Sequence, residues 1–272
     1  MKKTLLIVGV FLLGQLVAGA ILAIAFAARA SSQGADMAAD YVPPLYDMLV
    51  ALMVSDIIII VATILICRKG FVEPFRWNMP AARGVTVTLL SLVGMTSLVV
   101  LTEAFAEWLD LPDYMADTFQ AASLSPLSLW AMAIVGPLAE EIACRYGIAG
   151  SLLEKKYPAW AVILISAIFF SILHMNPAQM LVAFIIGVFL GWLYVITRSV
   201  WPCIIVHVAN NAVSVVMMRL NPDNPEEMTL SNMIDNNALY IGVLCGCAVV
   251  FAVAVYALHK TAAPLAALRD KH

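Results

Sequence analysis

Long apolar stretches recur along the whole chain, and they constrain its fold more than any other feature. Of the 272 residues, 63% are hydrophobic and 12% are charged, whereas soluble domains carry about 25% charged residues. Each long stretch could cross a hydrocarbon core of about 30 Å as a helix. The sequence therefore predicts an all-α, polytopic transmembrane bundle, with residues 1–272 forming a single membrane domain. The lipid bilayer is its expected surroundings, and nothing indicates a nucleic-acid partner.

The apolar stretches predict eight membrane spans. The first one resembles a secretory signal, but its apolar run exceeds the usual 7–15 or so residues, so we interpret it as an uncleaved span. The predicted spans are about 1–28, 45–67, 85–102, 127–149, 160–175, 180–196, 200–218 and 239–258.

The charges of the connecting segments predict the orientation. Nearly all lysines and arginines fall at one set of span ends, and only Arg29 and Arg219 fall at the other. Because basic residues concentrate on the cytoplasmic side, we expect both termini to be cytoplasmic. Segments 103–125 and 221–237 are then external acidic loops, the first of them with an amphipathic helix on the outer leaflet. The expected location is a cell membrane, the plasma or inner membrane of a bacterium.

A charged cluster interrupts the apolar run of the fourth span. In the stretch LAEEIACRYG, Glu140, Glu141 and Arg145 lie within six residues. A charged side chain within the membrane has a high free energy, so such residues usually have a function. On a helix, Glu141 and Arg145 are i,i+4 neighbours that can pair, while Glu140 lies about 100° further around the axis and can face a cavity.

The turn between the fourth and fifth spans brings a histidine to the depth of Glu140. Tyr157 precedes Pro158 at this turn, and Glu140 and His174 lie 17 residues before and after Tyr157. In an antiparallel helix pair both would lie about 25 Å from the turn, which requires the fourth span to continue as a helix and to protrude on the cytoplasmic side. His207 and Asn211 share one face of the seventh span and can meet the same site.

These side chains are suited to hydrolysis. A carboxylate and an imidazole can deprotonate a water molecule, directly or through a metal. A second imidazole and an amide can donate hydrogen bonds to the oxyanion of a tetrahedral intermediate. No serine or cysteine is placed beside a base, and neither HExxH nor a cysteine-based zinc motif is present.

Three motifs in order resemble the CPBP intramembrane proteases, which include the type II CAAX prenyl endopeptidase and bacteriocin-processing relatives. The resemblance covers about residues 127–215, the four central spans. The motifs are EExxxR (Glu140, Glu141, Arg145), FxxxH (Phe170, His174) and YxxTxSxxPxxxxHxxxN (Tyr194, Thr197, Ser199, Pro202, His207, Asn211). The chain departs from the family's usual pattern on either side of the motif arginine, at Cys144 and Tyr146, where pocket shape and substrate could differ.

The resemblance implies an intramembrane endopeptidase that cleaves a peptide or membrane-associated substrate. Glu140 and His174 would activate the water, while His207 and Asn211 would stabilise the oxyanion. Glu141 and Arg145 would support them. Family members are described both as metalloproteases and as metal-free glutamate proteases. In the first case a divalent ion such as zinc would be held by Glu140, His174 and His207.

Other interpretations of the same residues stay open. The charged cluster could brace the helices, or serve a proton-coupled transporter, or belong to a non-catalytic peptide-binding or immunity protein of the same fold. We interpret Asp56 as a packing or cavity residue rather than a catalyst. Gly187 and Gly191 form a GxxxG motif that we assign to packing inside the bundle. The motifs do not identify the substrate, its cleavage site or the oligomeric state.

Overall fold

The computed structural model describes residues 2–33, 44–67, 75, 77, 79–220 and 229–269, with side chains described except at 29–33 and 263–269. All regular structure in this part of the chain is helical. The elements in order are α1 (Lys2–Gln33), α2 (Leu45–Cys67), α3 (Ala81–Leu109), α4 (Ala116–Ser123), η2 (Leu129–Val135), α5 (Gly136–Glu141), η3 (Ile142–Ala149), α6 (Gly150–Glu154), α7 (Ala159–Ile172), α8 (Pro177–Thr197), α9 (Trp201–Leu220), α10 (Leu230–Met233) and α11 (Asn237–Arg269).

Six of the described helices are long and apolar enough to cross a membrane, namely α1, α2, α3, α8, α9 and α11. The predicted fourth span is the run of η2, α5, η3 and α6, which we call the central helix (129–154). The predicted fifth span is α7, an apolar helix of 14 residues. The multi-pass helical bundle is therefore confirmed, although the fifth span is shorter than expected.

The segment 103–125 is more helical than its interpretation as an external loop implied. Helix α3 continues to Leu109, and only residues 110–115 separate it from α4. Arg219 at the end of α9 donates hydrogen bonds to the carbonyls of Ser123 and Ser125, both at 2.6 Å. Helix α4 therefore packs back onto the bundle. Of the second predicted external loop, residues 221–228 lie outside the described residues.

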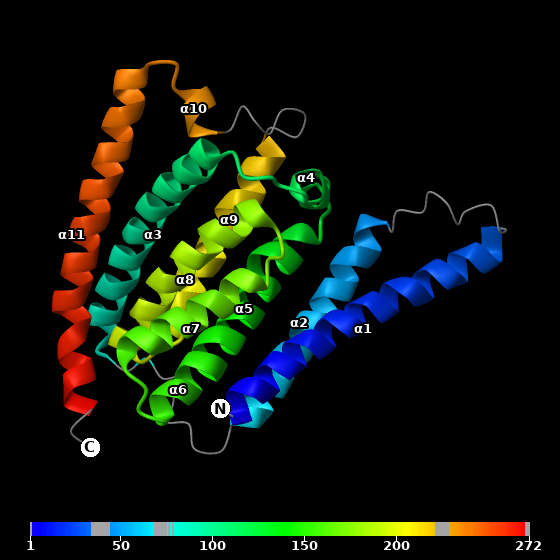
Figure 1. Cartoon of the computed structure of the whole chain (residues 1–272), viewed down its shortest axis with the longest axis horizontal. Coiled ribbons are helices and arrows are strands. Elements are labelled where there is room, and N and C mark those ends of the chain that lie inside the picture. Colours follow the sequence, from blue (N-terminus) through cyan, green and yellow to red (C-terminus); the bar gives the residue numbers. More distant parts are fainter. Residues whose placement is uncertain are drawn as a thin grey trace.

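The helices form a central group flanked by two pairs (Figure 1). Helices α11 and α3 pack together on one side and α1 and α2 on the other, while α7 and α8 pack against each other beside the central helix. The N-terminus lies near α6, and the C-terminus lies at the same end of the bundle, while α4 and α10 lie at the opposite end. This arrangement agrees with both termini being on one side of the membrane.

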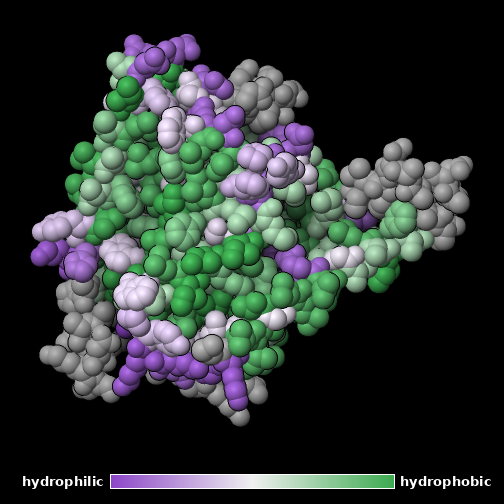
Figure 2. All heavy atoms as spheres, viewed as in Figure 1, coloured by the Kyte–Doolittle hydropathy of each residue, from purple (hydrophilic) through white to green (hydrophobic). Residues whose placement is uncertain are grey.

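The surface has the polarity of a membrane protein. Figure 2 shows a broad hydrophobic band, with hydrophilic side chains gathered toward the two ends of the bundle. Large apolar side chains on the flanking helices are exposed, for example Leu16 at 70% and Val249 at 63%. Exposed apolar side chains in such a band are stable in contact with the hydrocarbon core of a membrane.

The central helix is the most deeply enclosed element. Residues 141–152 are all buried, and Ser166 of α7 donates a hydrogen bond to the carbonyl of Cys144 at 3.2 Å. At its last residue, Glu154 pairs with Lys3 of α1 at 2.9 Å. The helix does continue to the predicted turn, and α1, α2 and α7 pack around it. Its protrusion on the cytoplasmic side stays a prediction.

The GxxxG motif brings α8 close to α7. A Cβ atom added at Gly187 would lie 3.1 Å from the Cα of Ala167, and one added at Gly191 would lie 3.5 Å from the Cα of Ile163. Small residues allow two helix backbones to approach in this way. The assignment of this motif to packing within the bundle is confirmed.

Candidate active site

Two π-helical segments bracket the short α-helix that carries both glutamates. The N–H of Gly136 bonds to the carbonyl of Ala131, and the N–H of Gly150 bonds to that of Arg145, both five residues back. Pro137, at the start of α5, has no N–H to donate and so interrupts the regular ladder. π-helical turns are rare and are frequently found at functional sites. Here they flank the helical turn that carries Glu140 and Glu141 on both sides.

Glu141 and Arg145 form a sealed ion pair. Arg145 Nη1 lies 2.9 Å from Glu141 Oε1, and both side chains are 0% exposed. Arg145 Nη2 also donates a hydrogen bond to the carbonyl of Gly187 at 3.1 Å, and the guanidinium lies over the ring of Phe170 at 4.6 Å. The predicted i,i+4 pair is confirmed. Its cation is further stabilised by α8 and α7, which sequence spacing alone did not indicate.

His207 connects the two glutamates. Its Nδ1 lies 2.9 Å from Glu141 Oε1, and its Nε2 lies 3.6 Å from Glu140 Oε2. The Glu141 carboxylate can only accept, so Nδ1 must carry a proton. If Nε2 carries no proton and Glu140 is ionised, the ring nitrogen and the carboxylate oxygen present lone pairs to each other. A second proton, on Nε2, would let His207 donate toward Glu140 or toward a ligand in the site.

Glu140 differs from its neighbour in being open to the surroundings. Its side chain is 23% exposed, whereas that of Glu141 is 0% exposed. The two residues are adjacent on α5, yet only Glu141 is enclosed by Arg145 and His207. An ionised carboxylate that borders open space and touches an imidazole is placed as a general base should be.

His174 reaches the cluster through Phe170. Its Nδ1 lies 3.0 Å from the carbonyl oxygen of Phe170, so Nδ1 carries the proton and Nε2 is left as an acceptor. The Phe170 ring contacts the rings of both His174 and His207, with centroids 5.1 and 5.5 Å apart. Among the described residues no hydrogen bond or ion pair joins His174 directly to Glu140, although both belong to the same cluster.

Asn211 lies one turn beyond His207 on α9. Its Nδ2 donates a hydrogen bond to the carbonyl of Met132 in η2 at 3.1 Å, and its side chain is only partly buried. An amide nitrogen has two N–H groups, so one remains for a ligand. This contact holds α9 to the first π-helical segment and aligns the amide beside the histidine.

The structure thus gathers the predicted site residues around one cluster and adds contributors that the sequence did not single out. Phe170 appeared only as a motif letter, yet it touches Arg145, His174 and His207. The carbonyl of Gly187 and that of Met132 are backbone groups. No side-chain pattern could have revealed those two.

The donor set does not form a metal cage among the described residues, where no three His, Cys, Asp or Glu side chains converge closely enough to hold an ion. Glu141 Oε1 already accepts from Arg145 and His207, and His207 Nδ1 is used by Glu141. Among the described residues, Glu140, His174 and His207 therefore do not form a three-ligand set, and no step below passes through a metal.

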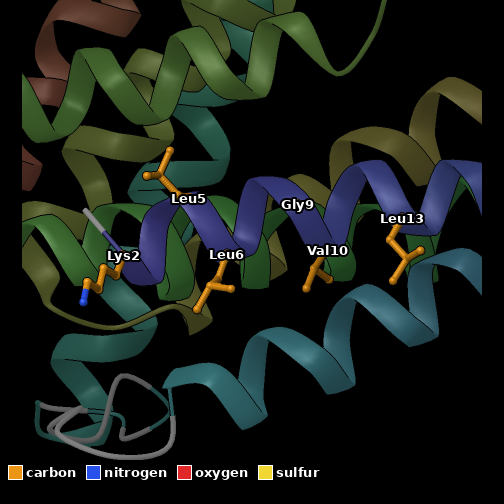
Figure 3. A pocket seen from close by; sticks show the side chains of 6 residues that line it. All are labelled: Lys2, Leu5, Leu6, Gly9, Val10 and Leu13. Atoms are coloured by element: carbon orange, nitrogen blue, oxygen red, sulfur yellow. The ribbon is translucent and has the colours of Figure 1, made fainter.

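A concavity of about 510 Å³ lies elsewhere, on α1. It is lined by Lys2, Leu5, Leu6, Gly9, Val10 and Leu13 (Figure 3). Apart from Lys2 it offers only apolar surface. It has the chemistry of a lipid-contact surface, and the reactive groups are all in the cluster around α5.

Comparison with known proteins supports the same region. The family model described as type II CAAX prenyl endopeptidase Rce1-like matches residues 122–213. The "Putative membrane peptidase YdiL" of Bacillus subtilis (strain 168) is 37% identical over 106 residues, which are 39% of this chain and 41% of that protein. The chain thus aligns with about two fifths of the length of this curated relative. The resemblance to the CPBP proteases is confirmed. No solved structure matches the chain.

Proposed function

Taking residues 122–213 as the core of a CPBP-family protease, we propose that the protein is an intramembrane endopeptidase. It hydrolyses a peptide bond of a peptide or membrane-associated substrate with water activated by Glu140. The observation that carries the proposal is the connected series of contacts from Arg145 through Glu141 and His207 to Glu140.

In the first step Glu140 removes a proton from water, and the resulting hydroxide attacks the carbonyl carbon of the scissile bond. The acceptor Nε2 of His174 orients this water from the other side. Glu140 is suited to the role because its carboxylate borders open space. A positioned base of this kind typically contributes about 10²–10⁴-fold to the rate.

Attack places a negative charge on the former carbonyl oxygen. The Nε2–H of the imidazolium of His207 and the second amide N–H of Asn211 are the donors that stabilise it. Glu141 holds the imidazole through Nδ1, and Arg145 keeps Glu141 ionised by pairing with it. The protonated Glu140 then gives its proton to the leaving amine as the C–N bond breaks, and an acid and an amine are released.

A proton-coupled transporter is not favoured, because both matches are to peptidases. A non-catalytic peptide binder of the same fold would keep the cluster but would release no product. We place the protein in a cell membrane, as expected for a bacterial protein of this kind.

The test is cleavage by purified protein in proteoliposomes of bacterial lipid, with pooled internally quenched peptides as probes. Wild-type protein should release fluorescence, and Glu140→Gln should not, although it should fold equally well. If both proteins cleave the same peptides at the same rate, Glu140 is not the base and the proposal fails.

A further inference from the structure

Asp56 of α2 is a buried carboxyl that the mechanism above does not use. It is 4% exposed, lies near the middle of α2, and makes no hydrogen bond among the described residues. Its Oδ2 is buried without a partner. A carboxyl at this depth costs several kcal/mol unless its oxygens find donors. Packing alone therefore does not account for it.

The unpartnered oxygen points at the helix that carries Glu140. A Cβ atom added at Gly136 would lie 3.8 Å from Asp56 Oδ2, so this oxygen lies over the start of α5. Glu140 is four residues further along, on the same face of that helix. Asp56 and Glu140 are also close enough to interact electrostatically, and two neighbouring carboxyls increase the need for a hydrogen-bond donor between them.

Thr63 provides an internal comparison. It is seven residues beyond Asp56 and so lies on the same face of α2, about two turns away. It too is buried, with an unpartnered Oγ1, and it faces a glycine of the central helix, since a Cβ at Gly147 would lie 2.9 Å from Thr63 Cγ2. No glutamate lies one turn from Gly147. Of these two polar residues, only Asp56 therefore lies next to the reactive groups.

A substrate supplies the missing donor. A peptide drawn into an apolar site brings backbone N–H groups that need acceptors, because no bulk water is available there. We propose that Asp56 is a substrate-binding residue, whose Oδ2 accepts a hydrogen bond from a backbone N–H of the peptide close to the scissile bond. This inference rests on the proposed endopeptidase function. It would place the peptide beside α2, which packs against the α5 helix that carries Glu140.

The proposal predicts a specific kinetic signature. Loss of a hydrogen bond that is made equally in the bound and transition states leaves a buried peptide N–H without an acceptor, which raises KM and leaves kcat nearly unchanged. We expect Asp56→Ala to raise KM by about 10- to 100-fold with kcat within about threefold. Asp56→Asn, which keeps an acceptor oxygen, should recover most of the loss. Thr63→Val is the matched control and should behave as wild type.

A second probe tests the contact itself. In a peptide that the wild type cleaves, each backbone N–H near the cleavage site is replaced in turn by an ester oxygen. One ester should raise KM for the wild type about as much as Asp56→Ala does, and it should add little when Asp56→Ala is already present. Monodispersity and thermal unfolding in detergent verify that each variant is folded.

The outcomes separate the two proposals. If no peptide is cleaved in a Glu140-dependent way, the proposed function fails and this inference fails with it. If cleavage depends on Glu140 but Asp56→Ala keeps the wild-type KM, or if Thr63→Val matches its defect, Asp56 does not bind substrate. The same conclusion follows if every ester substitution adds its full effect on top of Asp56→Ala.

Discussion

The two faces of α5 carry the same side chain in opposite surroundings. On the sealed face, Glu141 is 0% exposed and holds Arg145 and His207. On the open face, Glu140 is 23% exposed, touches His207 at 3.6 Å and approaches Asp56. The difference shows that membrane burial by itself does not define a role. A carboxylate whose donors are all internal stabilises the bundle, and one left facing space can react.

The largest effect should come from the open face. Glu140→Ala or Glu140→Gln removes the base and should lower kcat by about 10³-fold or more. Thermal unfolding in detergent should change little, since Glu140 is not part of the sealed pair. Peptide cleavage and unfolding are measured on the same preparation. A variant that retained activity would remove the distinction between the two faces.

Substitutions on the sealed face should lower the stability of the folded protein. Glu141→Ala leaves the buried Arg145 guanidinium without its anion, and breaking such a pair costs about 3–5 kcal/mol. We expect a large drop in unfolding temperature and in yield from membranes. Glu141→Gln keeps an acceptor oxygen and should recover part of that loss. Unfolding like that of the wild type for both variants would contradict the sealed-pair description.

His207 belongs to both faces, and its replacement sharpens the comparison. His207→Ala removes an oxyanion donor and should lower kcat by about 10²–10³-fold. It also removes one of the two hydrogen-bond donors to Glu141 Oε1, so a moderate destabilisation of about 1–3 kcal/mol should accompany the lower kcat. Asn211→Ala is the companion variant, since it should lower kcat while leaving the Glu141 pair intact.

A change remote from the reacting groups tests the support behind the sealed face. Gly187→Ala adds a methyl group 3.1 Å from the Cα of Ala167, which forces α8 away from α7. Overpacking of this kind costs about 1–3 kcal/mol. It also displaces the carbonyl that binds Arg145. Gly242→Ala, where a Cβ would meet nothing within 4 Å, is the control and should have no effect on unfolding.

The smallest expected effect is that of chelation. Because the described residues provide no three-ligand set, cleavage in proteoliposomes should continue after dialysis against EDTA. Activity that is lost with EDTA and restored by added zinc would overturn the metal-free mechanism. It would also require the open face to rearrange around an ion.

The sequence predicted the contacts that lie within one helix better than those between helices. Glu141 and Arg145 are i,i+4 neighbours, and their pairing was confirmed. The contact of His207 with Glu141 depends on how α9 is rotated, which residue spacing does not determine. The depth calculation for Glu140 and His174 assumed a regular α-helical rise, whereas η3 lies between Glu140 and the turn. The equal depth of the two residues stays a prediction, and the calculation did not indicate that the ring of Phe170 contacts both His174 and His207.

Asp56 shows a different limit. Its spacing within α2 matches no motif, so the sequence favoured a packing role. Only the position of Oδ2 over Gly136 relates it to the site. A residue that acts across a helix interface has no local signature in the sequence.

The pairing of α11 with α3 and α8 has a consequence for how the protein is made. Every side chain of the cluster comes from α2, the central helix, α7 with the turn that follows it, or α9, and all of these elements precede α11 in the sequence. The reactive groups can therefore come together during translation, while α11 is still being synthesised. Helix α11 is the last long helix to be synthesised, and it packs on the outer flank of α3 and α8. During biogenesis it therefore joins helices that already carry all the reactive side chains.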